Sequence, residues 1–339
     1  MPVGCGTHTA RIIDRDGATV STTEVLVEVE WTRTLDDIST ARVMIHPDAN
    51  CCAQIGQVRS WRHRLVIWRA GRRDPVWEGP IVTISWPVVG VEPVEITAVD
   101  VLGWLDRRVP HQDMQFGGAD LTDIAEWLIR DGFRPDDPGH VVHIVAPTRV
   151  RGDRAYEQDV GQTGDHLRDL AETGLDYTAV GSRIILMPED HCERVGALTD
   201  ADFPDGLVVA EDGAALATRW VVHGDEGIKG EAGGSDSYYG LLERSEEETS
   251  ILDRSSAAAA ARSRLRGSRP APVYLDSERV TLSPQAAVEV PSLVPGWCVD
   301  VTTTATCRNI AQSLKILSVR VSEDEQGEQV SVQLAPSGM

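Results

Sequence analysis

The side chains of this chain that could hold a metal ion occur in two short segments. His191, Cys192 and Glu193 offer three types of ligand in a row. Adjacent side chains of a strand point to opposite faces, so these three cannot all reach one metal. The segment 14–17, Asp-Arg-Asp-Gly, begins like a calcium loop, but Val25 occupies the twelfth position, where a bidentate glutamate is required. We therefore predict a turn between two strands at 14–17 and no metal site in either segment.

Clustered carboxylates are the second source of candidate chemistry. They occur at Asp200, Asp202 and Asp205, and as three glutamates at 246–248. With a formal net charge of -21, such groups are expected on a solvated acidic face, whereas a glycosidase pair needs a set separation within a cleft. The chain contains no G-x-S-x-G, H-E-x-x-H, Walker or G-x-G-x-x-G signature. We predict no catalytic, cofactor-binding or metal-binding residue; a cell-wall hydrolase that uses His191 or these aspartates is the less favoured alternative.

The chain contains nine tryptophans, which form a third group of candidate functional residues. An exposed tryptophan can serve as a platform for a sugar ring, so a carbohydrate-binding adhesin is an alternative function. Aromatic residues also dominate protein cores and subunit contacts, and we favour these roles for the tryptophans in or beside the predicted strands. These are Trp61, Trp68, Trp77, Trp86 and Trp104.

The overall composition excludes several classes of partner. The 339 residues, 41% hydrophobic and 25% charged, are ordinary for a globular protein and suffice for two or three cores. The acidic balance disfavours nucleic acid as a main partner, because phosphate binding needs clustered lysine and arginine. No apolar run approaches the roughly 20 residues of a membrane helix, and residues 1–6 do not resemble a secretory signal.

The six cysteines suggest no metal site and no obvious disulfide framework. Cys51 and Cys52 are adjacent, which suits neither tetrahedral zinc nor an ordinary disulfide. Cys298 and Cys307 could face each other across a hairpin. In a reducing cytoplasm we expect the cysteines to remain thiols.

Residues 1–110 are predicted to form a β module. In the segment 24–31, Val25, Val27, Val29 and Trp31 share one face, which is the period of a half-buried strand. The segment 65–68 is apolar on both faces and should be a central strand. The Gly79-Pro80 pair predicts a bulge or a bend at a sheet edge. Further strands are expected at 41–45, 76–84 and 94–99, with a turn at 71–75.

Residues 111–200 change to a small α/β unit. Leu121, Ile124, Ala125, Leu128 and Ile129 form the stripe of an amphipathic helix. Asp120 can cap its start, and Gly132 is expected just beyond its C-cap. A strand at 141–145, a second helix at 163–172 and a hairpin at 177–186 with Gly181 in its turn complete the unit.

The remaining residues are predicted to form strands around one helix. Strands at 207–209 and 217–222 should flank a turn at Asp212-Gly213. The segment 224–240, with six glycines, is expected to be a mobile loop. The Ala-rich segment 247–266 should be a helix. The expected fold class is thus α+β, mainly β, with parts at 1–110, 111–200, 201–245 and 246–339; later strands are expected at 280–282, 298–302, 314–321 and 330–334.

Three motifs occur in a fixed order in the second half of the chain. Tyr239–Glu243 contains a Tyr-Gly-x-x-Glu turn, the Ala-rich helix follows, and Leu293–Val301 reads Leu-x-Pro-Gly-x-x-Val-x-Val. This order resembles the tail hub (baseplate hub) proteins of long-tailed bacteriophages. The N-terminal segments 29–41, 76–80 and 98–105 are similar to minor tail proteins from phages of GC-rich hosts.

The resemblance implies a structural virion component and no enzyme. Hub proteins of this kind have two related β-barrel-like modules, and three chains form a ring that joins the tail tube to the host-recognition tip. It implies a homotrimer at the virion tail tip, assembled in the host cytoplasm, and contacts with the distal tail protein, the tape measure protein and other minor tail proteins. Host cell-wall polysaccharide is a further candidate partner. The family-motif residues, considered as assembly contacts, are Trp77, Gly79, Trp104, Tyr239, Gly240, Leu293, Pro295 and Gly296.

Overall fold

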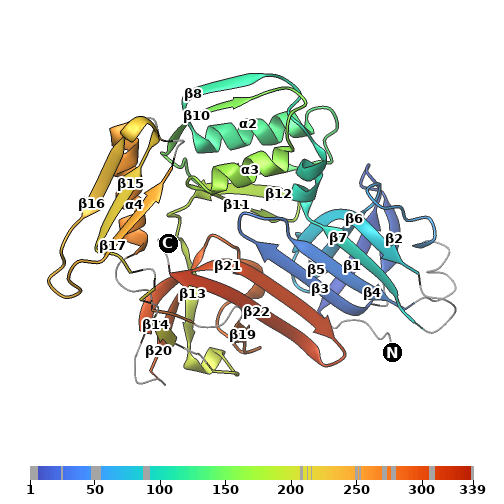
Figure 1. The fold of residues 1–339 in the computed structure, drawn as a ribbon. Coiled ribbons are helices and arrows are strands. Elements are labelled where there is room, and N and C mark those ends of the chain that lie inside the picture. The colour runs from blue at the N-terminus through green and yellow to red at the C-terminus, as the bar shows by residue number, and fades with distance from the viewer. Residues whose placement is uncertain are drawn as a thin grey trace.

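The computed structural model (Figure 1) describes residues 7–23, 26–46, 55–86, 92–206, 209–211, 213–214, 216–248, 251, 253–268, 273–275, 280–304 and 310–336. Within these ranges the fold is mainly β with fewer helices, as the sequence predicts. None of the helices described is long and apolar enough to cross a bilayer. Figure 1 shows an α/β unit above a large sheet, with a layer of three strands and a helix at one side.

The N-terminal and C-terminal β regions are joined into one 12-stranded sheet. The joint is the antiparallel pair of β3 (Leu26–Thr34) and β21 (Ile310–Asp324), which lie side by side in Figure 1. The described pairings run as an open path and do not close into a barrel. The path, in order, is β13 (Arg194–Thr199), β20 (Cys298–Thr303), β21, β3, β4 (Thr40–Ile45), β7 (Val94–Val99), β6 (Trp77–Ser85), β5 (Arg64–Arg69), β1 (His8–Ile13) and β2 (Thr19–Thr23), with β22 (Gly327–Pro336) on β21 and β19 (Val280–Leu282) on β22.

The burial of β3 follows the predicted alternation only in its second half. Val29 and Trp31 are fully buried, as expected. A register shift between Leu26 and Glu28 interrupts the pairing with β4. Because an extra residue reverses the side-chain alternation, Leu26 is buried while Val27 is only partly so. Val25 lies outside the described residues.

The strand β6 changes its partner strand directly after the Gly79-Pro80 pair. Its first part pairs with β5 and its second part, from Ile81, pairs with β7. The register with β7 shifts between Ile81 and Thr83, just after the predicted position, and this irregularity lies inside the sheet and not at an edge. A Cβ atom on Gly79 would lie 1.8 Å from the main-chain oxygen of Val99, so the close approach of the two backbones requires a residue without a side chain. The prediction that β5 is central is confirmed by its pairing with β1 and β6.

The α/β unit packs two helices against a three-stranded sheet. Its core is formed by apolar residues of both helices and of β11 and β12. Asp120 accepts a hydrogen bond from the main-chain nitrogen of Thr122 and so caps α2 as predicted. The elements are η1 (Val101–Arg107), β8 (Met114–Asp120), α2 (Leu121–Phe133), β9 (Val141–Ile144), β10 (Arg151–Tyr156), α3 (Thr163–Ala171), β11 (Leu175–Val180) and β12 (Arg183–Pro188).

The end of α2 corrects the expectation for Gly132. This residue is buried within the helix, which ends at Phe133 with Arg134 as its C-cap. A Cβ atom on Gly132 would lie 3.3 Å from a methyl carbon of Leu105 and 3.4 Å from Thr163. The glycine thus permits close packing of α2 on η1 and α3, and it does not end the helix.

The segment 224–240 is expected to be one mobile loop, but its first part has regular secondary structure. It contains η3 (Asp225–Gly227) and β16 (Lys229–Gly233), which pairs with β15 (Arg219–His223). A Cβ atom on Gly230 would lie 2.1 Å from the backbone of Ala257 in α4 (Arg254–Gly267). The glycines of β16 and the alanines of α4 therefore bring strand and helix into direct backbone contact.

The Ala-rich helix begins later than predicted. Residues 243–247 form β17 (Glu243–Glu247), an exposed strand parallel to β15. The helix starts only after Asp253, which accepts hydrogen bonds from the main-chain nitrogens of Ser255 and Ser256. This cap fixes the helix start at Asp253, and the pairing of β17 with β15 overrides the good helix propensity of the preceding glutamates.

The strands on either side of the predicted turn at Asp212-Gly213 do not pair with each other. The strand β14 (Val209–Glu211) pairs with β18 (Val273–Leu275), and β15 belongs to a different sheet. Asp212 itself lies outside the described residues. Two short 3-10 helices, η2 (Asp200–Asp202) and η4 (Val290–Ser292), complete the fold.

Candidate functional site: the junction of the β regions and an exposed loop

A buried arginine joins the two β regions. Arg33 on β3 is 1% exposed. Its Nη1 donates to the main-chain oxygens of Pro291 and Leu293, at 3.2 and 3.1 Å, and its Nη2 donates to that of Val76 at 2.8 Å. Burial lowers the pKa of Arg33 to about 10. No ion pair between Arg33 and a carboxylate occurs among the described residues, so main-chain dipoles stabilise its charge.

The first strand is tied to the last hairpin by a second buried contact. His8 Nδ1 lies 2.5 Å from Glu323 Oε2, and the side chain of neither residue is exposed by more than 4%. The indole nitrogen of Trp31 donates to His8 Nε2 at 3.2 Å. The proton shared with Glu323 must therefore be on Nδ1. Although burial opposes it, hydrogen bonds from His8 and Thr7 hold the pKa of Glu323 below its usual value.

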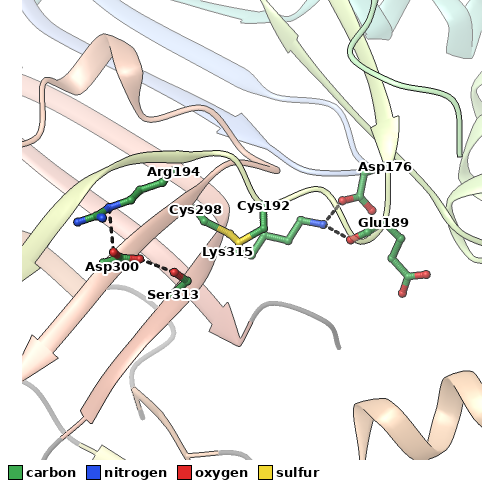
Figure 2. The surroundings of a disulfide bond; sticks show 8 residues. All are labelled: Asp176, Glu189, Cys192, Arg194, Cys298, Asp300, Ser313 and Lys315. Atoms are coloured by element: carbon green, nitrogen blue, oxygen red, sulfur yellow. Dashed lines mark hydrogen bonds and ion pairs between the residues drawn. A yellow bond between two sulfur atoms is a disulfide. The ribbon is translucent and has the colours of Figure 1, made fainter.

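The α/β unit is attached to the sheet by a buried ion pair (Figure 2). Lys315 on β21 pairs with Asp176 on β11 and donates to the main-chain oxygen of Glu189 at 2.6 Å. Lys315 is 6% exposed and Asp176 is 3% exposed. Burial raises the pKa of Asp176 and of Glu189. Removing one partner of so deeply buried an ion pair leaves an uncompensated buried charge, which strongly destabilises the fold.

A disulfide lies next to this ion pair. Figure 2 shows Cys192, just before β13, bonded to Cys298 at the start of β20. The expectation that the cysteines remain thiols was wrong for these two, and Cys307 lies outside the described residues. The sequence gives no signal for the pairing, because 106 positions separate the two cysteines and only the parallel pairing of β13 with β20 brings them together.

The turn after β3 completes the contact with the α/β unit. Asp36 has a left-handed backbone, with φ 59°. It exchanges main-chain and side-chain hydrogen bonds with Tyr177 at 2.7 to 2.8 Å. Burial, with the nearby charge of Asp176, raises the pKa of Asp36 to about 7. The pKa of Tyr177 is also raised by burial.

The predicted motif residues of the N-terminal part lie in the interior of the chain. Trp77 is 2% exposed and follows Val76, which binds Arg33. Gly79 faces the end of β7. Trp104 is 8% exposed and meets Trp61 edge to face at 5.4 Å. The core role expected for tryptophans is thus confirmed for Trp77 and Trp104, whereas Trp86 is 48% exposed.

The Leu-x-Pro-Gly motif is brought to the same junction. Leu293 is fully buried, and its main-chain oxygen accepts from Arg33. Pro295 is buried. Gly296 has φ 91°, and a Cβ atom there would lie 2.3 Å from the sulfur of Met187 on β12. The motif therefore forms a corner that fits between β3 and the α/β unit.

Tyr239 and Gly240 lie apart from the other motif residues, in a loop between β16 and β17. A bridge between Asp236 and Gly240 closes the loop, and Gly240 has φ 75°. Three large apolar side chains around them are exposed: Tyr238 by 86%, Leu241 by 52% and Leu242 by 38%. We call residues 236–242 the apolar loop. An exposed apolar group of this kind is typical of a contact with another molecule.

The residues considered for chemistry make local structural contacts. Among the described residues, no three His, Cys, Asp or Glu side chains lie close enough to hold a metal ion. His191 meets Trp297 edge to face at 5.0 Å, and burial lowers its pKa. Asp202 caps η2 by binding Thr199, and Asp200 accepts from Thr304. The segment 14–17 is the turn between β1 and β2, as predicted.

Solved phage tail proteins share this architecture over nearly their whole length. The 43 kDa tail protein of prophage MuSo2 from Shewanella oneidensis has a TM-score of 0.68 and 12% identity, with 98% of each chain covered. The tail protein from Neisseria meningitidis MC58 has a TM-score of 0.66 and 14% identity, with 98% of this chain and 97% of that chain covered. The chain has the fold of these tail proteins.

A more distant relative of this fold comes from a secretion system. The E. coli c3393 protein, a type VI secretion component described as structurally similar to the T4 tail proteins gp27 and gp5, has a TM-score of 0.56 and 12% identity. The alignment covers 92% of this chain and 73% of that one. No protein-family model and no curated protein matches the sequence. This chain and the solved structures thus share a fold although their sequence identity is low.

Two residues at the centre of the junction are not among the predicted site residues. Arg33 lies on the same face of β3 as Val29 and Trp31, so the alternation of side chains along the strand indicates that the charge of Arg33 points inward. Lys315 is one of only two lysines in the chain. The partners of both residues come from distant segments, and these partners cannot be read from local pattern.

Proposed function

We propose that this chain is a structural, non-enzymatic component of a phage tail hub. In this proposal three copies form a ring at the tail tip, which joins the tail tube to the host-recognition tip. The observation that carries it is the match to prophage tail proteins over 98% of the chain at a TM-score of 0.68. The buried hydrogen bonds between the N-terminal and C-terminal β regions also support it, because a ring component must hold these two regions in one fixed arrangement.

The partners proposed for this role are other tail proteins. We propose that the chain forms a homotrimer and contacts the distal tail protein, the tape measure protein and other minor tail proteins. This assembly takes place in the host cytoplasm. The division into 1–110, 111–200, 201–245 and 246–339, the two β-barrel-like modules and the GC-rich host remain predictions.

The apolar loop is the proposed place for a contact between copies or with a tail partner. Six of the motif residues lie in the interior of the chain, and we propose that they support assembly indirectly by maintaining its conformation. They are Trp77, Gly79, Trp104, Leu293, Pro295 and Gly296. Tyr238 and Leu241 can make direct contacts, because they are exposed. With a net charge of -21 on each copy, such contacts must be apolar or locally paired to overcome repulsion.

Light scattering of the purified full chain tests the proposal, first alone and then with the neighbouring tail proteins. A trimer, or a ring formed with partners, is expected. Leu241→Asp should prevent association, whereas Val160→Asp, at a side chain that is 53% exposed elsewhere, should not. A chain that stays monomeric under all conditions would overturn the hub proposal. Association that Leu241→Asp leaves intact would overturn only the role of the apolar loop.

A further inference from the structure

The strand β17 lies at one edge of its three-stranded sheet, and all of its residues are exposed. The main-chain oxygen of Leu242 and the main-chain nitrogen of Glu248 both bind β15. Because main-chain groups alternate in direction along a strand, those of Glu243, Ser245 and Glu247 point away from β15. No hydrogen bond to these outward groups occurs among the described residues. Such an edge is a template for a strand of another molecule.

The charge of β17 limits which strand can pair with it. The segment 243–247 contains three glutamates and one arginine. Glu243 and Glu246 form ion pairs with arginines of β15 and α4, whereas Glu247 has no ion pair within the described ranges. Antiparallel pairing of β17 with the β17 of another copy would place Glu243 opposite Glu247, and like charges in opposite positions are destabilising. The partner strand must therefore carry positive charge.

The strand β10 in the α/β unit is a second free edge. It pairs only with β8, in a sheet of two strands. The main-chain oxygen of Val150 accepts from the main-chain nitrogen of Leu121 at 3.1 Å, and Arg151 lies opposite Asp120. In this antiparallel pattern the main-chain groups of Arg151 point away from β8. They bind no other residue in the part of the chain described, so this edge is also open to a partner.

The edge at β10 has the opposite charge to β17. Arg149, Arg151 and Arg154 occur close together, and the first two are exposed. The printed bonds of Arg151 and Arg154 go to main-chain oxygens and a threonine hydroxyl. None of the three has a carboxylate partner among the described residues, although the chain contains 53 acidic and 32 basic side chains. These guanidiniums are therefore available to carboxylates of another molecule.

The turn before β10 presents Arg149 in a fixed position. Its backbone is left-handed, with φ 61°, a conformation that is uncommon for a residue with a side chain. Asp120 holds the turn: Oδ2 accepts from the main-chain nitrogen of Arg149 at 2.7 Å, and Oδ1 accepts from Thr148 Oγ1 at 2.8 Å. A backbone that is ordered before binding loses little conformational entropy on binding.

Other positively charged residues on edge strands are already paired. Arg194 of β13 forms an ion pair with Asp300 at 2.8 Å, and Lys229 of β16 forms one with Glu231 at 3.4 Å. The edge at β10 is thus the better complement to the acidic edge of β17.

We propose that the β17 edge of one copy of this chain pairs with the β10 edge of the next copy. Glu247 meets the guanidiniums of Arg149 and Arg151, and main-chain hydrogen bonds join the two sheets. Because the two edges are different surfaces of one chain, the contact is heterologous and can close a ring. The apolar loop directly precedes β17 and extends the same surface. This inference rests on the proposed hub function and names the contact that holds its copies together.

Light scattering on the full chain tests the charge pairing, under the conditions in which the wild type forms its trimer or ring. Arg151→Glu places like charges at the contact and should raise the Kd of association about a hundredfold or more. Glu247→Arg should have the same effect. Both changes in one chain should restore association, because the charges are then exchanged. The matched control is Arg183→Glu, at an exposed arginine on β12, which should associate like the wild type.

Ser245→Pro tests the main-chain pairing. Proline removes an N–H group that points away from β15, so the variant should keep its own sheet. Association should fall at least about tenfold, the effect of losing a main-chain hydrogen bond at the contact. Ser245→Thr keeps the N–H group and should associate like the wild type. Circular dichroism melting shows whether each variant is folded.

Three results would overturn the proposal. A trimer or ring that Arg151→Glu leaves intact would refute the contact while the hub proposal stands, and this variant changes only an exposed side chain. Failure of the double variant to associate would show that the two edges do not face each other. Full association of folded Ser245→Pro would refute the main-chain pairing. A wild type that stays monomeric with and without tail partners would instead overturn the hub proposal, and this contact with it.

Discussion

Arg33 Nη1 on β3 lies 3.1 Å from the main-chain oxygen of Leu293, 260 positions later in the chain. The same guanidinium binds Val76 in the N-terminal region. One side chain thus fixes the Leu-x-Pro-Gly corner against the start of β6. Every residue has a main-chain oxygen whatever its side chain is. This contact can therefore persist while the surrounding sequence changes.

Replacing Arg33 should destabilise the whole chain. Arg33→Ala leaves three main-chain oxygens, two of them in buried hydrogen bonds, without this donor, and it opens a cavity. We expect a loss of about 3 kcal/mol or more in the free energy of unfolding. Arg33→Lys should not restore it, because a single ammonium cannot reproduce the planar fork that reaches both β regions. Urea unfolding measures the loss. Arg73→Ala, at an exposed turn position, should change stability by less than about 0.5 kcal/mol.

Gly79→Ala should be far more damaging than its size suggests. The added Cβ would meet the main-chain oxygen of Val99 at 1.8 Å, and neither strand can move without breaking the pairing of β6 with β7. We expect about 3 kcal/mol of destabilisation or failure to fold. Gly117→Ala is the control, because nothing lies within 4 Å of its added Cβ. Equal melting temperatures for both variants would show that the backbone at Gly79 does not approach Val99 this closely.

The stability of the chain should depend on pH through Asp100, which caps η1. Burial raises its pKa from 3.8 to about 7 in the folded chain. Between these values the folded chain holds a proton that the unfolded chain has released, so the group favours folding at low pH. This contribution is lost as the pH rises from about 4 to about 7.

The variant Asp100→Asn tests this pH dependence. It does not titrate, so its free energy of unfolding should fall less steeply over the same pH range than that of the wild type. Asn is expected to be less stable at every pH, because Asp100 accepts from both Ser39 and Leu102; the slope is therefore the readout. Asp16→Asn, in the exposed β1–β2 turn, should keep the wild-type slope. Parallel pH profiles for Asp100→Asn and the wild type would contradict the prediction.

Reduction of the Cys192–Cys298 bond should lower stability. The bond closes a loop across 106 positions, and constraint of the unfolded chain by such a loop contributes about 2–5 kcal/mol. Thermal unfolding with and without dithiothreitol measures this difference. Cys192→Ser should be destabilised to a similar extent and should not respond to the reductant. A wild type that is insensitive to dithiothreitol would show that the two cysteines are not bonded in solution.

The sequence pattern predicted the elements that are determined by interactions between residues close together in the chain. The stripe from Leu121 to Ile129 and the cap at Asp120 specified α2, because both act within one or two turns. The apolar run 65–68 identified β5 as central. The start of α4 was misplaced because the glutamates of β17 have no apolar period, and their strand exists only through its pairing with β15.

The sequence by itself determined the class of the fold, most of its strands, its two amphipathic helices and the resemblance to tail proteins. The tertiary structure alone decided that β3 pairs with β21, that Arg33 and Lys315 meet their distant partners, that Cys192 bonds Cys298, and that the glycines of β16 serve packing. Each of these depends on segments far apart in the chain coming together, and the sequence pattern of one segment carries no information about which distant segment it will meet.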